Sequence, residues 1–251
     1  SGTATEAINI TTKPLTGATI ATIADQTYTG SEIKPEPAVS IVLVSGTEAT
    51  TLVKGTDFEY SYANNTNVPT SADIQPTVTI NGKGNYSGTT SANFVINKAS
   101  ITPTVSIEGW TYGTAANTPS VTGNSGNGAV TYTYKAEGAQ AFTSEMPTAV
   151  GTHTIKATIA ETTNYNGGEA TSSFTISNPT LDPEKDINFA EGQTFASYYN
   201  AEVDAMLPEK GLAAYMITGL EGNTLTIKAI SYIPKGTPVL IEKTDANVTT
   251  E

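Results

Sequence analysis

The chain has 251 residues, enough for two or three domains, and a formal net charge of −12. Its lysines are spread singly, which argues against nucleic acid and anionic lipid as partners, because both need clustered basic residues. Cysteine is absent, so disulfides, thiolate nucleophiles and cysteine-ligated zinc are excluded. The longest apolar run, which starts at Ala38, is too short to cross a membrane.

An internal repeat organises the first two thirds of the chain. Its landmarks recur in the same order: an Ile five positions before a Tyr, an Asn-Tyr pair, and a closing Phe-x-Ile. In the first repeat these are Ile23, Tyr28, Asn85-Tyr86 and Phe94-x-Ile96; in the second they are Ile107, Tyr112, Asn164-Tyr165 and Phe174-x-Ile176. We therefore expect domains at 15–98 and 99–178. Residues 1–14 resemble the junction between the repeats, which predicts a remnant of an upstream repeat or a linker strand.

Hydrophobicity inside each repeat alternates with a period of two. Phe58, Tyr60 and Tyr62 share one face, and Ile155, Ala157 and Ile159 share another, with polar residues between them. This pattern is typical of antiparallel strands with one solvated face. About 80 residues with six or seven short strands predict an immunoglobulin-like sandwich in each repeat. The fold class is therefore all-β, with tandem sandwiches and a smaller C-terminal β domain.

The Asn-Tyr-x-Gly element is expected to form the turn between the last two strands of each repeat. Its Asn and Gly residues should supply backbone conformations that β-branched residues resist. Its Tyr ring should close the open end of the sandwich, with the hydroxyl bonded to backbone. Tyr86→Phe or Tyr165→Phe is then expected to cost about 1 kcal/mol. The structural-turn residues are Asn85, Tyr86, Gly88, Asn164, Tyr165 and Gly167.

The pattern changes after the second repeat. Pro179 and Pro183 in a polar run indicate a linker at 179–186, followed by a C-terminal β domain at 187–251. Residues 211–230 read as two strands joined by a Gly-Asn turn. Residues 200–207, with the sequence NAEVDAML, are expected to form a short helical turn.

Little in the chain points to catalysis. His153 is the only histidine, and its place in the alternation predicts a partly buried, hydrogen-bonded residue at a strand start; the alternative is a base or a metal ligand. The acidic groups Asp57-x-Glu59 and Asp182-x-Glu184-x-Asp186 are interpreted as solvated surface charges, with a glycosidase pair as the alternative. We expect no catalytic residue, no metal and no cofactor, and hence no enzymatic activity.

Aromatic residues offer the better candidates for binding. Trp110 is the sole tryptophan and occupies the position of Gln26 in the first repeat. Beside Tyr112 it could stack on a sugar ring; the alternative is that Trp110 packs at the junction between the two repeats. Tyr198 and Tyr199 are a second candidate, one ring pointing inward and the other outward.

The stretches LVKGTDFEYSYANNTNV, TVTINGKGNYSGT and FVI resemble the immunoglobulin-like repeats of bacterial surface and secreted proteins, especially those of Bacteroidetes. The resemblance covers roughly residues 15–178. The C-terminal segment resembles the small β domain of leucine-rich-repeat-associated Bacteroidetes surface proteins. It does so through Thr194–Tyr198, Gly211–Tyr215 and Ile233–Leu240. Those domains usually extend further, so we expect this one to be incomplete.

The resemblance implies an extracellular module of a multidomain protein. We expect a monomeric rod at the outer cell surface or outside the cell, after removal of an export signal, which does not insert into a membrane. Its expected role is a scaffold for adhesion or spacing that presents other domains, with a host matrix protein or glycan as partner. The alternative is a carbohydrate-binding module of a polysaccharide-capture protein.

Overall fold

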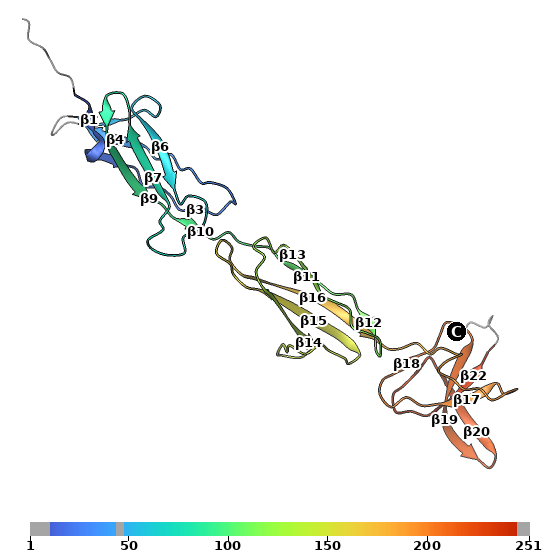
Figure 1. Ribbon diagram of the computed structural model, residues 1–251. Helices are drawn as coiled ribbons and strands as arrows, with labels where there is room; N and C mark the ends of the chain where they lie inside the picture. The colour runs from blue at the N-terminus through green and yellow to red at the C-terminus, as the bar shows by residue number, and fades with distance from the viewer. Residues whose placement is uncertain (1–10, 44–47, 245–251) are drawn as a thin grey trace, which may run out of the picture. The chain divides into compact units, whose positions relative to one another are not determined.

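The computed structural model describes residues 11–43 and 48–244 (Figure 1). These residues form two compact units. The first unit consists of Ser1–Pro103, Gly123–Val130 and Thr158–Gly168, and the second of Thr104–Thr122, Thr131–Ala157 and Glu169–Glu251. The prediction of an all-β chain is confirmed. Within the described ranges, no helix is long and apolar enough to cross a membrane.

In the first unit, the first repeat (15–98) contains two three-stranded antiparallel sheets. One sheet has the order β2 (Ala18–Ile20), β4 (Val39–Val42), β5 (Ala49–Thr51), and the other β6 (Phe58–Ala63), β7 (Thr77–Gly82), β9 (Thr89–Asn93). Two short parallel pairs complete it, β1 (Lys13–Pro14) with β8 (Tyr86–Ser87) and β3 (Gln26–Thr27) with β10 (Ile96–Asn97). A 3-10 turn, Leu15–Gly17, follows β1.

The core of the first repeat follows from the alternation. Phe58, Val78 and Ile80 point inward from one sheet, and Val39 and Ile41 point inward from the other. All five are at most 2 % exposed. Each sheet buries the apolar face of the other, so the predicted two-sheet arrangement is present. The immunoglobulin-like identity of the strand order stays a prediction.

The second repeat (99–178) pairs β11 (Thr104–Ser106) with β13 (Ser120–Thr122) in an antiparallel ladder. Its larger sheet has the order β12 (Trp110–Thr111), β16 (Gly168–Ser177), β15 (Gly151–Ile159), β14 (Val130–Ala136). Along β15, buried residues alternate with half-buried ones, and Ile155 and Ala157 are fully buried. The period-two interpretation of this stretch is confirmed.

The C-terminal segment lies in the second unit. Its main sheet has the order β17 (Phe195–Tyr198), β22 (Val239–Lys243), β19 (Leu212–Glu221), β20 (Thr224–Ile230). The predicted hairpin is therefore confirmed as β19–β20. The helical turn predicted at 200–207 is wrong, because β18 (Ala205–Met206) pairs with β21 (Tyr232–Ile233). Leu181, from the predicted linker, is buried in the core of this segment.

Two predictions concern the ends of the chain. Most of the predicted N-terminal remnant, residues 1–10, lies outside the described residues, as does the end of the C-terminal segment from residue 245. Within the described part of the remnant, residues 11–14, Lys13–Pro14 form β1 and pair with β8 of the first repeat.

Candidate functional site

Trp110 lies on an edge strand of the second repeat. It stands opposite Ile176 in the parallel ladder of β12 and β16, as Gln26 stands opposite Ile96 in the first repeat. The equivalence of Trp110 and Gln26 is thus confirmed. The indole is partly buried and stacks on the ring of Phe174, with centroids 5.2 Å apart and an interplanar angle of 21°. This ring contact lies inside the second repeat, and not at the junction between the repeats that was the alternative.

His153 lies on the same aromatic cluster and is 3 % exposed. Its ring stacks on Phe174 at 5.6 Å, and its Nε2 donates a hydrogen bond of 2.8 Å to the carbonyl oxygen of Ala149. Because a carbonyl only accepts, Nε2 carries the hydrogen. Nδ1 is buried and has no hydrogen bond within the described part of the chain. The predicted hydrogen bond of His153 is therefore present, and the residue is buried where the sequence predicted partial burial.

Trp110 and Tyr112 line one pocket of about 370 Å³, which we call the aromatic pocket. Its other lining residues are Gly113, Thr114, Ala116, Met146, Pro147 and Thr148. The structure therefore brings the two predicted aromatic residues together. A flat indole, a phenol, a proline ring and threonine hydroxyls are groups that suit the mixed surface of a sugar.

The hydroxyl of Tyr112 donates a 3.2 Å hydrogen bond to Oε2 of Glu202 in the C-terminal segment. This bond to a carboxylate raises the pKa of Tyr112, because it stabilises the protonated phenol. Tyr112 also lines a neighbouring polar pocket of about 460 Å³, together with Glu202, Asp204 and Lys235. Tyr112 thus contacts both the aromatic pocket and the segment that follows the repeat.

The Asn-Tyr turns hold the chain where it enters each repeat. The N–H of Lys13 donates to the carbonyl of Asn85, and the N–H of Ala99 donates to the carbonyl of Asn164, both at 2.9 Å. In the same way Lys13 pairs in parallel with Tyr86, and Ala99 with Tyr165. In the sequence Asn85 lies between β7 and β9, and Asn164 lies between β15 and β16, which is where the turn was predicted.

In the second repeat the turn also contacts a loop of the first repeat, inside the first unit. Oδ1 of Asn164 accepts a 2.9 Å hydrogen bond from the N–H of Val68, and its Nδ2 donates to Oδ1 of Asn67 at 2.9 Å. The ring of Tyr165 meets that of Tyr28 edge to face, with centroids 5.3 Å apart. We call these five residues the junction clasp.

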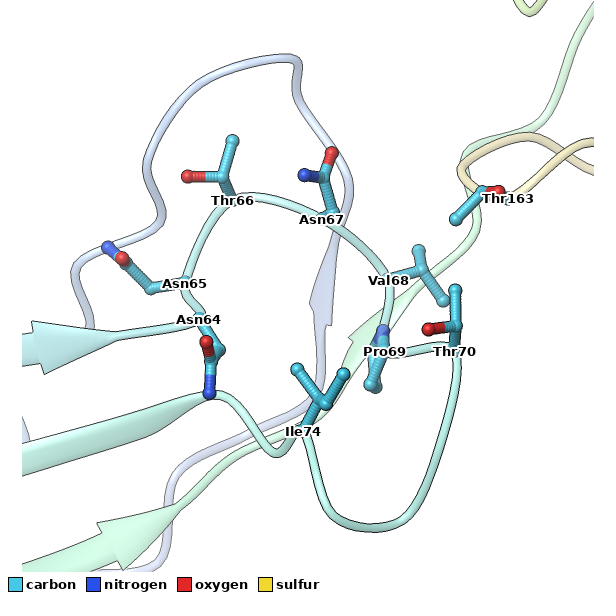
Figure 2. A pocket seen from close by; sticks show the side chains of 9 residues that line it. All are labelled: Asn64, Asn65, Thr66, Asn67, Val68, Pro69, Thr70, Ile74 and Thr163. Atoms are coloured by element: carbon cyan, nitrogen blue, oxygen red, sulfur yellow. The ribbon is translucent and has the colours of Figure 1, made fainter.

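The loop that carries Asn67 and Val68 borders a pocket of about 380 Å³ (Figure 2). Residues 64–70 and Ile74 line it, with Thr163 added from the stretch before Asn164. The loop is fixed by Asn64, whose φ of 54° is left-handed, and by Asn65, which is 7 % exposed. Nδ2 of Asn65 donates to the carbonyl of Ile33 at 3.1 Å, so the Asn65 amide holds the loop against the segment that contains Ile33.

Two details of the predicted turn chemistry are wrong. Among the described residues, Asn64 and Asn127 are the non-glycine residues with positive φ, so neither Asn85 nor Asn164 uses a left-handed conformation. Gly88 does, with φ 74°. Gly167 is needed for space instead, since a Cβ there would lie 2.7 Å from the carbonyl oxygen of Ile159.

The predicted hydroxyl bonds of the turn tyrosines are also wrong. Within the described ranges, no hydrogen bond joins the hydroxyl of Tyr86 or Tyr165 to a partner, and the ring of Tyr86 packs against the first-repeat core. The hydroxyls of Tyr60 and Tyr62 take that role, and donate to the carbonyls of Pro37 and Pro35. The sequence signal for these two bonds was the pair of prolines at positions 35 and 37. Their carbonyl oxygens lie outside the strands, where a tyrosine hydroxyl can reach them.

Tyr198 and Tyr199 point to opposite sides, as predicted. Tyr198 packs against the C-terminal core, whereas Tyr199 is 58 % exposed. Neither lines the aromatic pocket.

The predicted surface carboxylates lie at the surface. Glu59 is paired with Lys83 at 3.3 Å with both side chains about half exposed, and Asp57 accepts a 2.8 Å bond from the N–H of Val53. Asp182 is paired with Lys185 at 3.0 Å. The pKa of Asp182 is lowered first by the hydrogen bond from the backbone N–H of Glu184 and then by Lys185. The bonds of Asp57 and Asp182 stabilise local turns, whereas the pair of Glu59 and Lys83 joins residues 24 positions apart.

Comparison with protein families gives one result. The sequence model described as the MBG domain matches residues 44–100 and again residues 104–180, which together are more than half of the chain. The two matches fall on the two repeats. No curated protein matches the chain.

Proposed function

Since the chain belongs to the MBG domain family, a β-rich repeat family found in bacterial surface proteins, we propose that it is a non-enzymatic extracellular scaffold. In this proposal the tandem repeats space or present adhesive domains at the surface of a bacterium of the Bacteroidetes type. The molecule acts as a monomer, and the partner of the adhesive domains is a host matrix protein or a glycan. The observation that carries the proposal is the way the chain passes from the first repeat to the second.

That passage is hydrogen-bonded at successive residues. The N–H of Ala99 donates to Asn164, and the N–H of Asn166 donates back to the carbonyl of Ala99, each at 2.9 Å. Lys98 forms an ion pair of 3.1 Å with Glu161. A flexible linker rich in glycine and serine would make no such contacts. A bonded passage between repeats suits a spacer, because a spacer must hold its modules at a fixed separation.

The net charge of −12 supports the same role. Like-charged scaffolds on one surface repel one another and stay apart from anionic surfaces. The buried position of His153 supports the non-enzymatic part of the proposal, since the only histidine of the chain is packed against Phe174.

The test is the accessibility of the chain on living cells that encode it. Antibodies raised against the 251-residue chain should label intact cells, and brief protease treatment of those cells should remove the label. Labelling that needs permeabilised cells would contradict the extracellular assignment. An antibody against a cytoplasmic protein is the control for leakage.

The aromatic pocket favours carbohydrate binding as a second candidate function. Trp110 and Tyr112 line it together with threonine residues, as a sugar-stacking site requires. A glycan and host-matrix array should be run with the intact chain, with Tyr112→Ala and with Tyr199→Ala. Tyr199 is the control, because it is an exposed tyrosine that does not line the aromatic pocket. Glycan binding lost in Tyr112→Ala alone supports this function, and no glycan binding by the intact chain contradicts it.

A further inference from the structure

Each repeat has an incoming end, where the chain enters, and an outgoing end, where it leaves. At the outgoing end of the first repeat lie Tyr28, Asn67 and Val68. At the incoming end of the second repeat lie Asn164 and Tyr165. The junction clasp is therefore a contact between one outgoing and one incoming end, to which the repeated motif contributes the side chains of Asn164 and Tyr165.

The first repeat carries the same incoming end. Asn85 and Tyr86 share two backbone contacts with Asn164 and Tyr165, namely the 2.9 Å bond from the entering residue and the parallel pairing with it. The Asn85 side chain is exposed, and it makes no hydrogen bond to any residue in the part of the chain that the structure describes. The motif is thus built at both positions, but its amide is used at only one of them.

We propose that Asn85 and Tyr86 form a docking surface for the outgoing end of a further MBG repeat that precedes Lys13 in the same polypeptide. The Asn85 amide would accept from a backbone N–H equivalent to that of Val68 and donate to an acceptor equivalent to Oδ1 of Asn67. Tyr86 would meet a tyrosine equivalent to Tyr28. The proposal rests on the spacer function, and it names the partner that continues the spacer.

The route of the backbone selects a preceding repeat as the partner. Lys13 is bonded to Asn85 as Ala99 is bonded to Asn164, so a repeat joined before Lys13 would connect at the same place on this turn as the first repeat does at Ala99. A repeat joined there is held next to the surface by its own connection, which raises its effective concentration. The surroundings of the two turns differ: Gly82 and Gly84 stand where the second repeat has Glu161 and Thr163. Thr12 stands in the place of Lys98, so the ion pair of Lys98 with Glu161 has no counterpart. The two side chains are 27 % and 69 % exposed, and a partly solvated pair of this kind contributes little.

The test uses an extended chain in which a copy of residues 13–98 is joined directly to residue 13 of the chain 13–251. Thr70→Ser in the added copy distinguishes its loop peptide by mass. Hydrogen exchange of the Val68 amide is then measured in both copies. Asn85→Ala in the original copy should accelerate exchange of the added Val68 about tenfold, the factor given by about 1.4 kcal/mol. The original Val68 should be unaffected.

Asn164→Ala is the matched control, and it should accelerate the original Val68 and leave the added one unaffected. The proposal is overturned if Asn164→Ala has its effect while Asn85→Ala has none, or if neither variant has an effect. A second extended chain with a Gly-Ser linker before Lys13 covers misfolding of a direct fusion. An added copy that lacks protection at Val68 in both chains also counts against docking. None of these outcomes depends on whether the protein is found outside the cell.

Discussion

The junction clasp predicts a measurable difference between two copies of one motif. Asn164→Ala in the 251-residue chain removes two hydrogen bonds, one from the N–H of Val68 and one to Oδ1 of Asn67. A hydrogen bond of this kind contributes about 0.5–1.5 kcal/mol net. The bond to Val68 is partly buried and the bond to Asn67 is exposed. The expected loss at the junction is therefore about 1–2 kcal/mol.

Hydrogen exchange measures this loss directly. The Val68 amide should exchange about 5–30 times faster in Asn164→Ala, the range that corresponds to such a change in free energy. Amides within β6 and β7 should exchange as in the unchanged protein, because the substitution does not touch the first-repeat core. Asn85→Ala in the same chain is the control, and it should leave Val68 unchanged and alter stability by less than about 0.5 kcal/mol.

The refuting results are equally specific. If Val68 exchanges at the same rate in both variants and in the unchanged protein, the clasp does not restrain the loop. If Asn85→Ala accelerates Val68 as much as Asn164→Ala does, the effect is transmitted through the fold, and not through a bond to Asn164.

Three further predictions concern stability in urea unfolding. Tyr62→Phe should cost about 1 kcal/mol, because its hydroxyl donates a partly buried 3.0 Å bond to Pro35, whereas Tyr86→Phe should change stability by less than about 0.5 kcal/mol. Equal losses in the two variants would contradict this assignment of the hydroxyls. Burial raises the pKa of Tyr62 above its ordinary 10.0. Its contribution is complete below the pKa of the unfolded chain and is lost as pH rises through the folded value, so unfolding free energy should fall above pH 10, less steeply in Tyr62→Phe. Identical alkaline slopes would argue against it. Gly167→Ala should cost about 1–3 kcal/mol, because its Cβ would lie 2.7 Å from a backbone oxygen. Gly17→Ala, with no atom within 4 Å of the new Cβ, should be near neutral, and a similar cost at both glycines would refute the steric argument.

The sheets could be predicted from the sequence because burial in a strand is a local pattern. The inward positions Phe58, Ile155 and Ala157 follow from alternation alone, and the structure buries all three. The β19–β20 hairpin could be predicted equally well, because its Gly222-Asn223 turn joins two strands that follow each other directly in the sequence. Such features need no knowledge of what lies elsewhere in the fold.

The role of the Asn-Tyr turn could not be predicted in the same way. The partners of Asn164 are 96 and 97 positions away in sequence, in a loop of the other repeat. The sequence therefore suggested a local, conformational role for Asn164, whereas its amide bonds a distant loop.

The failed helical turn has a related cause. Oδ1 of Asn200 accepts from the N–H groups of Glu202 and Val203, the pattern shared by a helix N-cap and an isolated Asx turn. Because Ala205–Met206 pairs with Tyr232–Ile233, the segment forms an Asx turn followed by a strand, and not a helix. That pairing partner lies beyond the local sequence.

The comparison of Trp110 with Gln26 decides how the carbohydrate hypothesis is best tested. The strand pairing at this position does not depend on an aromatic side chain, because Gln26 makes the same parallel pairing in the first repeat. The side chain of Gln26 instead donates to the carbonyl of Ala24. In the second repeat the added indole stacks on Phe174, so one of its faces already has a packing partner. Trp110→Ala would therefore disturb packing and binding together. Tyr112→Ala leaves the stacking of Trp110 on Phe174 in place and removes one exposed 3.2 Å bond, from the Tyr112 hydroxyl to Glu202. Urea unfolding of Tyr112→Ala, measured beside the array, then separates a loss of glycan binding from a loss of stability.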